Sequence, residues 1–162
     1  MKRFDARDGA AFRATFGRFV TGVAVVTCRP PEGAPLGVTI NALASVSLEP
    51  ALALFCLEER AASLSSFLSA GHFALNILAE GQDERSARFA VDHSMTEVDP
   101  QEVWQSGAPV LTDALAVADC TLMDTFGGGD HVILLGRVLE VGWRQGVDPL
   151  VYYSGGYRRM EP

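Results

Sequence analysis

The sequence predicts a mainly β protein with short helices, folded as a largely antiparallel barrel that helices cover. Six or seven short apolar or alternating runs are separated by turn residues, and only two or three segments have helical periodicity. Strands and helices do not alternate regularly, which disfavours a doubly wound parallel sheet. The 162 residues, 48% of them hydrophobic, suffice for a sizeable core, and we expect one domain over residues 1–162.

The first predicted element is an amphipathic helix at residues 9–19. Phe12, Phe16 and Phe19 recur at helical spacing, and Asp8 stands where an N-cap is expected. A phenylalanine stripe of this kind is typical of packing. We therefore expect this helix to cover one side of the core.

Three strands are predicted in the next part of the chain. Residues 23–28 are rich in β-branched side chains, and residues 36–40 alternate. The proline-rich segment 29–35 between them predicts a turn, so the two strands form a hairpin with a longer loop. Residues 51–57 are apolar throughout, which predicts a strand buried on both faces.

The segment 37–50 has the pattern of a pocket wall. Four small hydrogen-bonding residues, Thr39, Asn41, Ser45 and Ser47, are interleaved with apolar ones, and no Lys or Arg interrupts them. The apolar positions would hold the segment to the core and leave hydroxyls, an amide and backbone N–H groups for a planar heteroaromatic ligand with a phosphate tail. The alternative is a half-exposed sheet that carries ordinary Ser and Thr, and this segment alone favours that alternative.

Two further helices and a strand follow. Residues 63–70 and 82–90 have helical spacing, and residues 73–78 read as a strand. Asn76 stands in the middle of that strand, where a buried amide must be hydrogen-bonded or costs about 1–3 kcal/mol. Residues 91–109 are polar and predict a loop or a short lid.

The last strong signal is a hairpin. Strands are predicted at residues 115–123 and 132–141, with a glycine-rich turn at 125–131 between them. His131 stands at the mouth of this hairpin, where its imidazole could donate a hydrogen bond or carry charge. A turn histidine capped by the preceding aspartate explains the position equally well.

Composition excludes several classes of function. The net charge of −7 argues against nonspecific nucleic-acid binding, and no apolar run approaches the roughly 20 residues of a membrane span. No secretory signal precedes the first element, so we expect a cytoplasmic protein. The three cysteines are far apart in apolar runs, which favours free thiols in a reducing compartment. The three histidines share no ligand spacing with them, so no metal site is expected.

Familiar catalytic motifs are also missing from the sequence. No Gly-x-Gly-x-x-Gly follows a strand, no Walker loop is present, and no Ser-His-Asp order is compelling. The three glycines at 127–129 lie between two predicted strands, so they do not form a dinucleotide fingerprint.

Several motifs, taken in order along nearly the whole chain, resemble the flavin reductases with the FMN-binding split-barrel fold. These proteins are the reductase components of two-component flavin-dependent monooxygenases. The resemblance rests on the following segments: Thr21-Gly22-Val23-Ala24-Val25-Val26-Thr27, Gly37-Val38-Thr39-Ile40-Asn41, Ser45-Val46-Ser47-Leu48-Glu49-Pro50, Phe73-Ala74-Leu75-Asn76-Ile77-Leu78, Gly129-Asp130-His131, Gly136-Arg137-Val138 and Gly156-Tyr157.

The resemblance implies an antiparallel, Greek-key-like barrel and a homodimer with the flavin near the subunit interface. His131 would position the nicotinamide, and the turn at 58–63 would help to hold the flavin phosphate. The flavin-binding residues that the resemblance implies are Thr39, Ile40, Asn41, Ala42, Ser45, Val46, Ser47, Arg60, Ser63, Asn76, Gln82 and Tyr157.

The implied activity is that of an NAD(P)H:flavin oxidoreductase. It would reduce FMN or FAD by hydride transfer from NADH or NADPH and supply the diffusible reduced flavin to a separate monooxygenase. One departure is Ala61, where such proteins usually have Ser or Thr, although Arg60 could compensate with charge. Two alternatives stay open: a non-catalytic flavin- or heme-binding carrier or sensor, and a structural dimer with a vestigial pocket.

Overall fold

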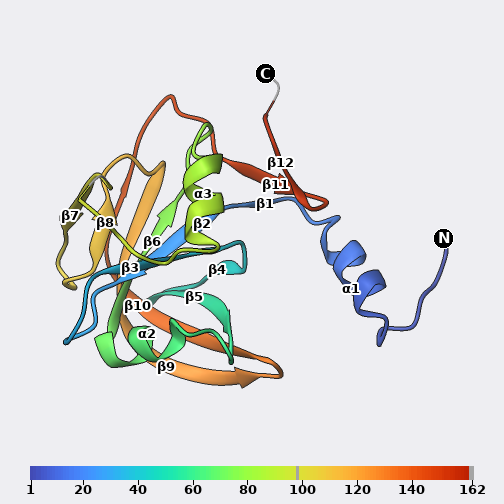
Figure 1. Ribbon diagram of the computed structural model, residues 1–162, viewed down its shortest axis with the longest axis horizontal. Helices are drawn as coiled ribbons and strands as arrows, with labels where there is room; N and C mark the ends of the chain where they lie inside the picture. Colours follow the sequence, from blue (N-terminus) through green and yellow to red (C-terminus); the bar gives the residue numbers. More distant parts are fainter. Residues whose placement is uncertain (98, 161–162) are drawn as a thin grey trace.

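A seven-stranded antiparallel sheet is the centre of the fold (Figure 1). The computed structural model describes residues 1–97 and 99–160, so residue 98, in the predicted loop, and residues 161–162 lie outside the described part. In spatial order the strands are β3 (Leu36–Ile40), β2 (Ala24–Cys28), β6 (His72–Ile77), β9 (Ala116–Gly128), β10 (His131–Trp143), β5 (Ala51–Glu58) and β4 (Leu43–Leu48). The predicted mainly β, antiparallel architecture is confirmed.

The sheet curls around one core. Its inner face brings together buried side chains from β2, β3, β5, β6, β9 and β10, among them Phe55, Phe73 and Leu134. The two edge strands, β3 and β4, follow each other in the chain but lie at opposite ends of the strand order. We call the place where the chain passes from β3 to β4, at residues 40–43, the seam.

A second core lies on the outer face of β2 and β6. It contains Val25, Phe89 and Leu111, with other buried apolar residues of the same face. All five residues of β2 are buried because neighbouring residues of this strand point into different cores. Strand β2 is therefore the rigid partner on which β3, the strand that leads to the seam, is aligned.

Short elements complete the fold. Helix α2 (Leu64–Ala70) covers the first core with Phe67, and α3 (Asp83–Phe89) covers the second with Phe89. Two small sheets remain: β1 (Thr21–Gly22) with β11 (Val151–Tyr153) and β12 (Gly156–Arg158), and β7 (Gln101–Val103) with β8 (Pro109–Leu111). No helix in the described ranges is both long enough and apolar enough to cross a membrane.

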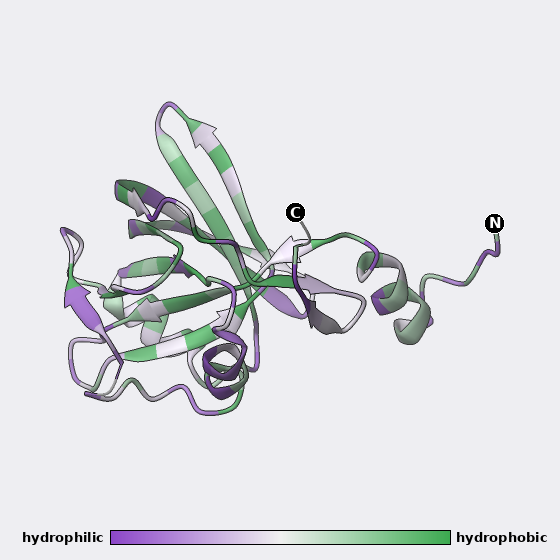
Figure 2. Ribbon diagram, turned by 90° about the horizontal axis from the view of Figure 1, so that it is seen from above, coloured by the Kyte–Doolittle hydropathy of each residue, from purple (hydrophilic) through white to green (hydrophobic). Residues whose placement is uncertain are grey.

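The first helix is shorter than predicted and does not cover the core. Helix α1 (Gly9–Phe16) buries none of its residues, and Phe12, Phe16 and Phe19 are 52%, 63% and 76% exposed. Both views show it standing apart from the sheet, near the N-terminus (Figures 1 and 2). The N-cap prediction is confirmed, since the Asp8 carboxylate accepts hydrogen bonds from the N–H groups of Ala10 and Ala11. The phenylalanines do recur at helical spacing, but no described part of the chain buries this face of the helix.

Strand β5 is buried on one face, whereas burial on both was predicted. Ala53, Phe55 and Leu57 point into the core, while the intervening Leu54 and Cys56 are half-buried. The reason is that no helix covers the outer face of β5, as it would in a parallel sheet.

The glycine-rich turn is tighter than predicted. Strands β9 and β10 extend through most of the segment 125–131, with His131 paired to Gly128, so only Gly129 and Asp130 form the turn. Gly129 has φ of +79°, which a side chain would disfavour. The polar segment 91–109 is also not one loop, because β7 begins at Gln101 and pairs with β8.

The remaining predictions are confirmed within two residues at each end. The hairpin of β2 and β3 is present, as are the helices at 63–70 and 82–90. Gly71 ends α2 in the left-handed conformation, with φ of +67°. Helix α3 packs on β3, one of the two strands joined at the seam, whereas α2 packs on β2 and β6.

Candidate functional site

Three hollows meet at the seam, and Ile40 and Asn41 line all of them. The apolar hollow has a volume of about 590 Å³ and is lined chiefly by residues 19–24 and 40–44, with Leu54 and Cys56 of β5 and Ile77 of β6. The tyrosine hollow, about 260 Å³, lies between Tyr152, Tyr157 and α3. The histidine hollow, about 480 Å³, includes His131 in its wall. Joined, they have the size of a site for a small organic cofactor.

Hydrogen bonds fix the β3 wall of these hollows to α3 and β12. The Thr39 hydroxyl donates to the Ser86 carbonyl oxygen (2.7 Å), and the Tyr157 hydroxyl donates to Ser86 Oγ (2.8 Å). Ser86 is fully buried, so these bonds are shielded from water. Strand β3 is thus attached to α3 through Thr39 and Ser86. As an edge strand of the sheet, it can offer backbone groups to a ligand.

Ser63 offers the clearest sign of a ligand in the histidine hollow. Its side chain is 4% exposed, and its hydroxyl has no hydrogen-bond partner among the described residues. It precedes α2 but does not cap it. A buried hydroxyl without a partner costs about 1–3 kcal/mol, which a bound acceptor would offset. Ala61 lines the same wall and adds no donor.

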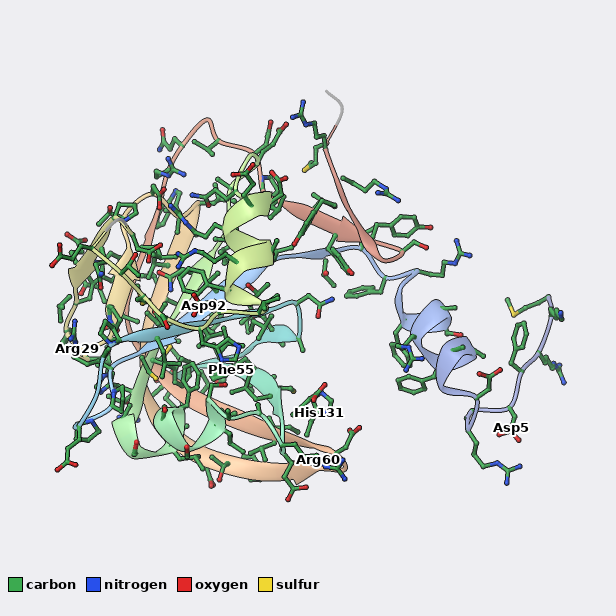
Figure 3. All side chains as sticks on the ribbon, viewed as in Figure 1. Asp5, Arg29, Phe55, Arg60, Asp92 and His131 are labelled. Atoms are coloured by element: carbon green, nitrogen blue, oxygen red, sulfur yellow. The ribbon has the colours of Figure 1, made fainter. Side chains whose placement is uncertain are left out.

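His131 begins β10 and lines the same hollow. Its Nδ1 lies 2.7 Å from Asp130 Oδ1, which orients the imidazole. This hydrogen bond, and then the charge of the ring, hold the pKa of the Asp130 carboxyl below its ordinary value. His131 and Arg60 lie at the same end of the β5 and β10 pair (Figure 3).

The site contains few charges. Of the residues that line the three hollows, none is Lys or Arg; the titratable ones beside cysteine and tyrosine are Glu58, His93 and His131. Within residues 1–97 and 99–160, no cluster of His, Cys, Asp and Glu has the makings of a metal site.

Of the predicted site residues, seven line the hollows and six do not. Those brought together are Thr39, Ile40, Asn41, Ala42, Ser63, His131 and Tyr157. Those outside are Ser45, Val46, Ser47, Arg60, Asn76 and Gln82.

The three predicted residues of β4 and Arg60 lie outside the hollows for simple reasons. Val46 sits at a register shift between Ser45 and Ser47, on an edge strand that is mostly exposed. The Ser47 hydroxyl accepts a hydrogen bond from the Glu49 N–H (3.2 Å). Arg60 is exposed, and its charge acts on Asp130 at the surface.

Asn76 and Gln82 are committed to the fold. The Asn76 amide donates to the Val25 carbonyl (2.9 Å) and to Thr27 Oγ1 (3.0 Å), and its oxygen accepts from the Leu111 N–H (2.8 Å). The predicted need for hydrogen bonds at this buried amide is therefore confirmed. Gln82 similarly accepts from the Ala79 N–H (2.8 Å) and donates to a carbonyl.

Sequence reasoning missed three residues of the site. Ser86 and His93 have no motif around them, and only the packing of α3 on β3 brings them to the hollows. Cys56 lines two hollows because it points to the outer face of β5. The other two cysteines, Cys28 and Cys120, are buried, which raises the pKa of each thiol to about 12. The one signal for Cys56 was the two-residue period of a strand, which puts Cys56 and Phe55 on opposite faces of β5.

Comparison with known proteins identifies the family of this chain. The family model described as a flavin reductase like domain matches residues 16–161. The chain belongs to the flavin reductase-like family. The fold implied by the sequence resemblance is thereby confirmed, since solved flavin reductases of the split-barrel type superpose on it.

Two relatives and one solved structure illustrate which proteins this flavin reductase-like chain is similar to. A protein named probable flavin reductase, from Rhizobium meliloti (strain 1021), is 41% identical over 93% of this chain, which spans only 48% of that protein's length. The reductase subunit HsaB of a flavin-dependent monooxygenase, from Rhodococcus jostii (strain RHA1), is 36% identical, with 98% of this chain and 81% of that protein covered.

The structure is that of the Streptomyces globisporus C-1027 NADH:FAD oxidoreductase SgcE6 in complex with NAD and FAD fragments. It is 33% identical, with a TM-score of 0.91 over 100% of this chain and 98% of that one.

Proposed function

We propose that this flavin reductase-like chain is an NAD(P)H:flavin oxidoreductase. It reduces FMN or FAD with NADH or NADPH and supplies the reduced flavin to a partner monooxygenase. The observation that carries the proposal is the histidine hollow, where the unpartnered Ser63 hydroxyl and the His131 imidazole share a cavity with the edge of β3. The names of the relatives support it: one is a monooxygenase reductase subunit, and the structural neighbour is an NADH:FAD oxidoreductase.

Each part of the site has a role in this proposal. Residues 39–42 provide backbone and side-chain polar groups for the edge of the flavin ring, and Ser63 donates to its phosphate. His131, oriented by Asp130, holds the nicotinamide nucleotide. When both ligands are bound, the nicotinamide would transfer a hydride to the flavin, and this transfer requires that the two rings be stacked and oriented. The hydride transfer itself needs no acid or base from the protein.

The apolar hollow supports the choice of a flat aromatic ligand. Its walls are mostly aliphatic, with contributions from Ala24, Leu43 and Leu54. Such walls exclude water from one face of a bound ring and leave the other face open to a second ring. The adjoining tyrosine hollow adds the edge of Tyr157, whose hydroxyl is fixed on Ser86.

We further propose that the chain acts as a homodimer. Several large apolar side chains are exposed on α1, on β4 and at the end of β10, and contact with a second copy would cover such surface. Leu48 is 97% exposed, Trp143 71% and Phe16 63%. Sedimentation of the wild-type chain at micromolar concentration tests this proposal. A dimer that dissociates when Phe12 and Phe16 are both changed to Ser supports it, and a wild-type monomer refutes it.

We also propose that residues 1–162 act as one domain in the cytoplasm. Both cores draw side chains from β2, β6 and β9, so they cannot separate without breaking these strands. The three free cysteines suit a reducing compartment.

The test of the activity is the oxidation of NADH and of NADPH, each with and without added FMN or FAD. Turnover that depends on added flavin supports a reductase with diffusible flavin. His131→Ala should raise KM for the nicotinamide nucleotide far more than KM for flavin. Absence of turnover with every combination refutes the proposed function, and flavin binding without turnover indicates a carrier or sensor.

A further inference from the structure

A second histidine, His93, lines the histidine hollow together with His131. His93 follows α3 and is half-buried. Its carbonyl oxygen accepts a hydrogen bond from the Gly37 N–H (2.8 Å) at the start of β3, and the next residue, Ser94, forms a bridge with Leu36. Met95 is buried in the second core. His93 is therefore held against β3 and has a fixed position beside the hollow.

The arginine side chains of the neighbouring segments, Arg60 and Arg88, do not line this hollow. Arg88 forms an ion pair with Asp99 and donates to the Ser94 carbonyl (3.0 Å), so its charge is already paired. The chain carries a net charge of −7, and Glu58 lies in the wall, so an anionic ligand depends on local positive groups. Among the described residues that line the hollow, only His93 and His131 have side chains that can take up a positive charge.

The two imidazoles differ in their surroundings. His131 Nδ1 is engaged by Asp130. The carboxylate next to His93, that of Asp92, accepts a hydrogen bond from the Ser94 N–H (3.0 Å) instead, and this bond is the main reason that the pKa of Asp92 lies below its ordinary value. His93 thus keeps its ring for a ligand in the hollow, and Ser63 in the same wall offers an unpartnered hydroxyl.

We propose that His93 is a phosphate-binding residue of the flavin site and, with the Ser63 hydroxyl, holds the terminal phosphate of FMN. This proposal rests on the proposed flavin reductase function. It assigns to His93 the compensation for the missing hydroxyl at Ala61 that the sequence suggested for Arg60. An imidazole N–H can donate to a phosphate oxygen, and a hydrogen bond to an ionised acceptor is about twice as strong as a neutral one.

The experiment compares FMN with riboflavin, which has the same ring and no phosphate. Quenching of flavin fluorescence is titrated for the wild type, His93→Gln, His93→Lys and the matched variant His131→Gln, with circular dichroism to show that each is folded. We expect the wild type to prefer FMN, and His93→Gln to lose about ten-fold in FMN affinity, equal to about 1.4 kcal/mol, with riboflavin binding unchanged. His93→Lys should restore the preference for FMN.

Several outcomes would overturn the assignment. If His93→Gln weakens FMN and riboflavin equally, or neither, the residue does not bind phosphate. If only His131→Gln abolishes the preference for FMN, the phosphate lies on the other side of the hollow. If the wild type binds both flavins equally, phosphate recognition fails while the proposed function stands. If it binds neither, both fail together.

Discussion

Gly37 joins the second core to the strand that forms the site, and its replacement by alanine should destabilise the protein measurably. A Cβ atom at this position would lie 2.9 Å from Val25 Cγ1 and 3.0 Å from two ring carbons of Phe89. Val25 and Phe89 are fully buried, so neither can move into solvent. Overpacking of a tight core costs about 1–3 kcal/mol.

The expected cost corresponds to a fall in Tm of roughly 2–12 °C for a chain of this size. Thermal and urea unfolding followed by circular dichroism measure it. The matched control is Gly127→Ala in β9, where an added Cβ meets nothing within 4 Å. Gly136→Ala should cost more than Gly37→Ala, because its Cβ would lie 2.3 Å from Phe73 Cζ. The reasoning is refuted if Gly37→Ala is as stable as Gly127→Ala.

Three further predictions concern the site and its surroundings. Tyr157→Phe and Ser86→Ala remove the same hydrogen bond, so each should cost about 0.5–1 kcal/mol in urea unfolding, and the double variant no more than the larger single. Burial lowers the pKa of His72, so the unfolded chain binds the proton more tightly than the folded chain. Stability should therefore fall as the pH drops below 6.5, the ordinary histidine pKa. His72→Gln should flatten this dependence, and an unchanged slope contradicts the assignment. A thiol reagent should modify Cys56 before the other two cysteines, and FMN should slow it; equal rates with and without FMN would place the flavin elsewhere.

The sequence determined most of the local structure. Alternation and β-branched residues located β2 and β3, and Gly71 located the end of α2. These signals are local, since side-chain period and allowed φ depend on residues within one or two turns. The antiparallel class followed for the same reason, because short turns can join only antiparallel neighbours.

The candidate site was predicted in part. The segment 39–42, Ser63, Tyr157 and His131 were named in advance and lie together at the seam. Asn76 was also named, but its amide ties β2, β6 and β8 together. A polar residue in an apolar strand looks the same in sequence whether its partner is a ligand or a backbone group.

Only the tertiary structure decided which side chains face the hollows and which face water. It turned Arg60 to the surface and brought His93 against β3 through a hydrogen bond between segments 56 residues apart, at Gly37 and His93. It also left the phenylalanines of α1 exposed, although their spacing is that of a core helix. Periodicity shows that a face is apolar, but what covers that face depends on strand pairing and on segments far along the chain.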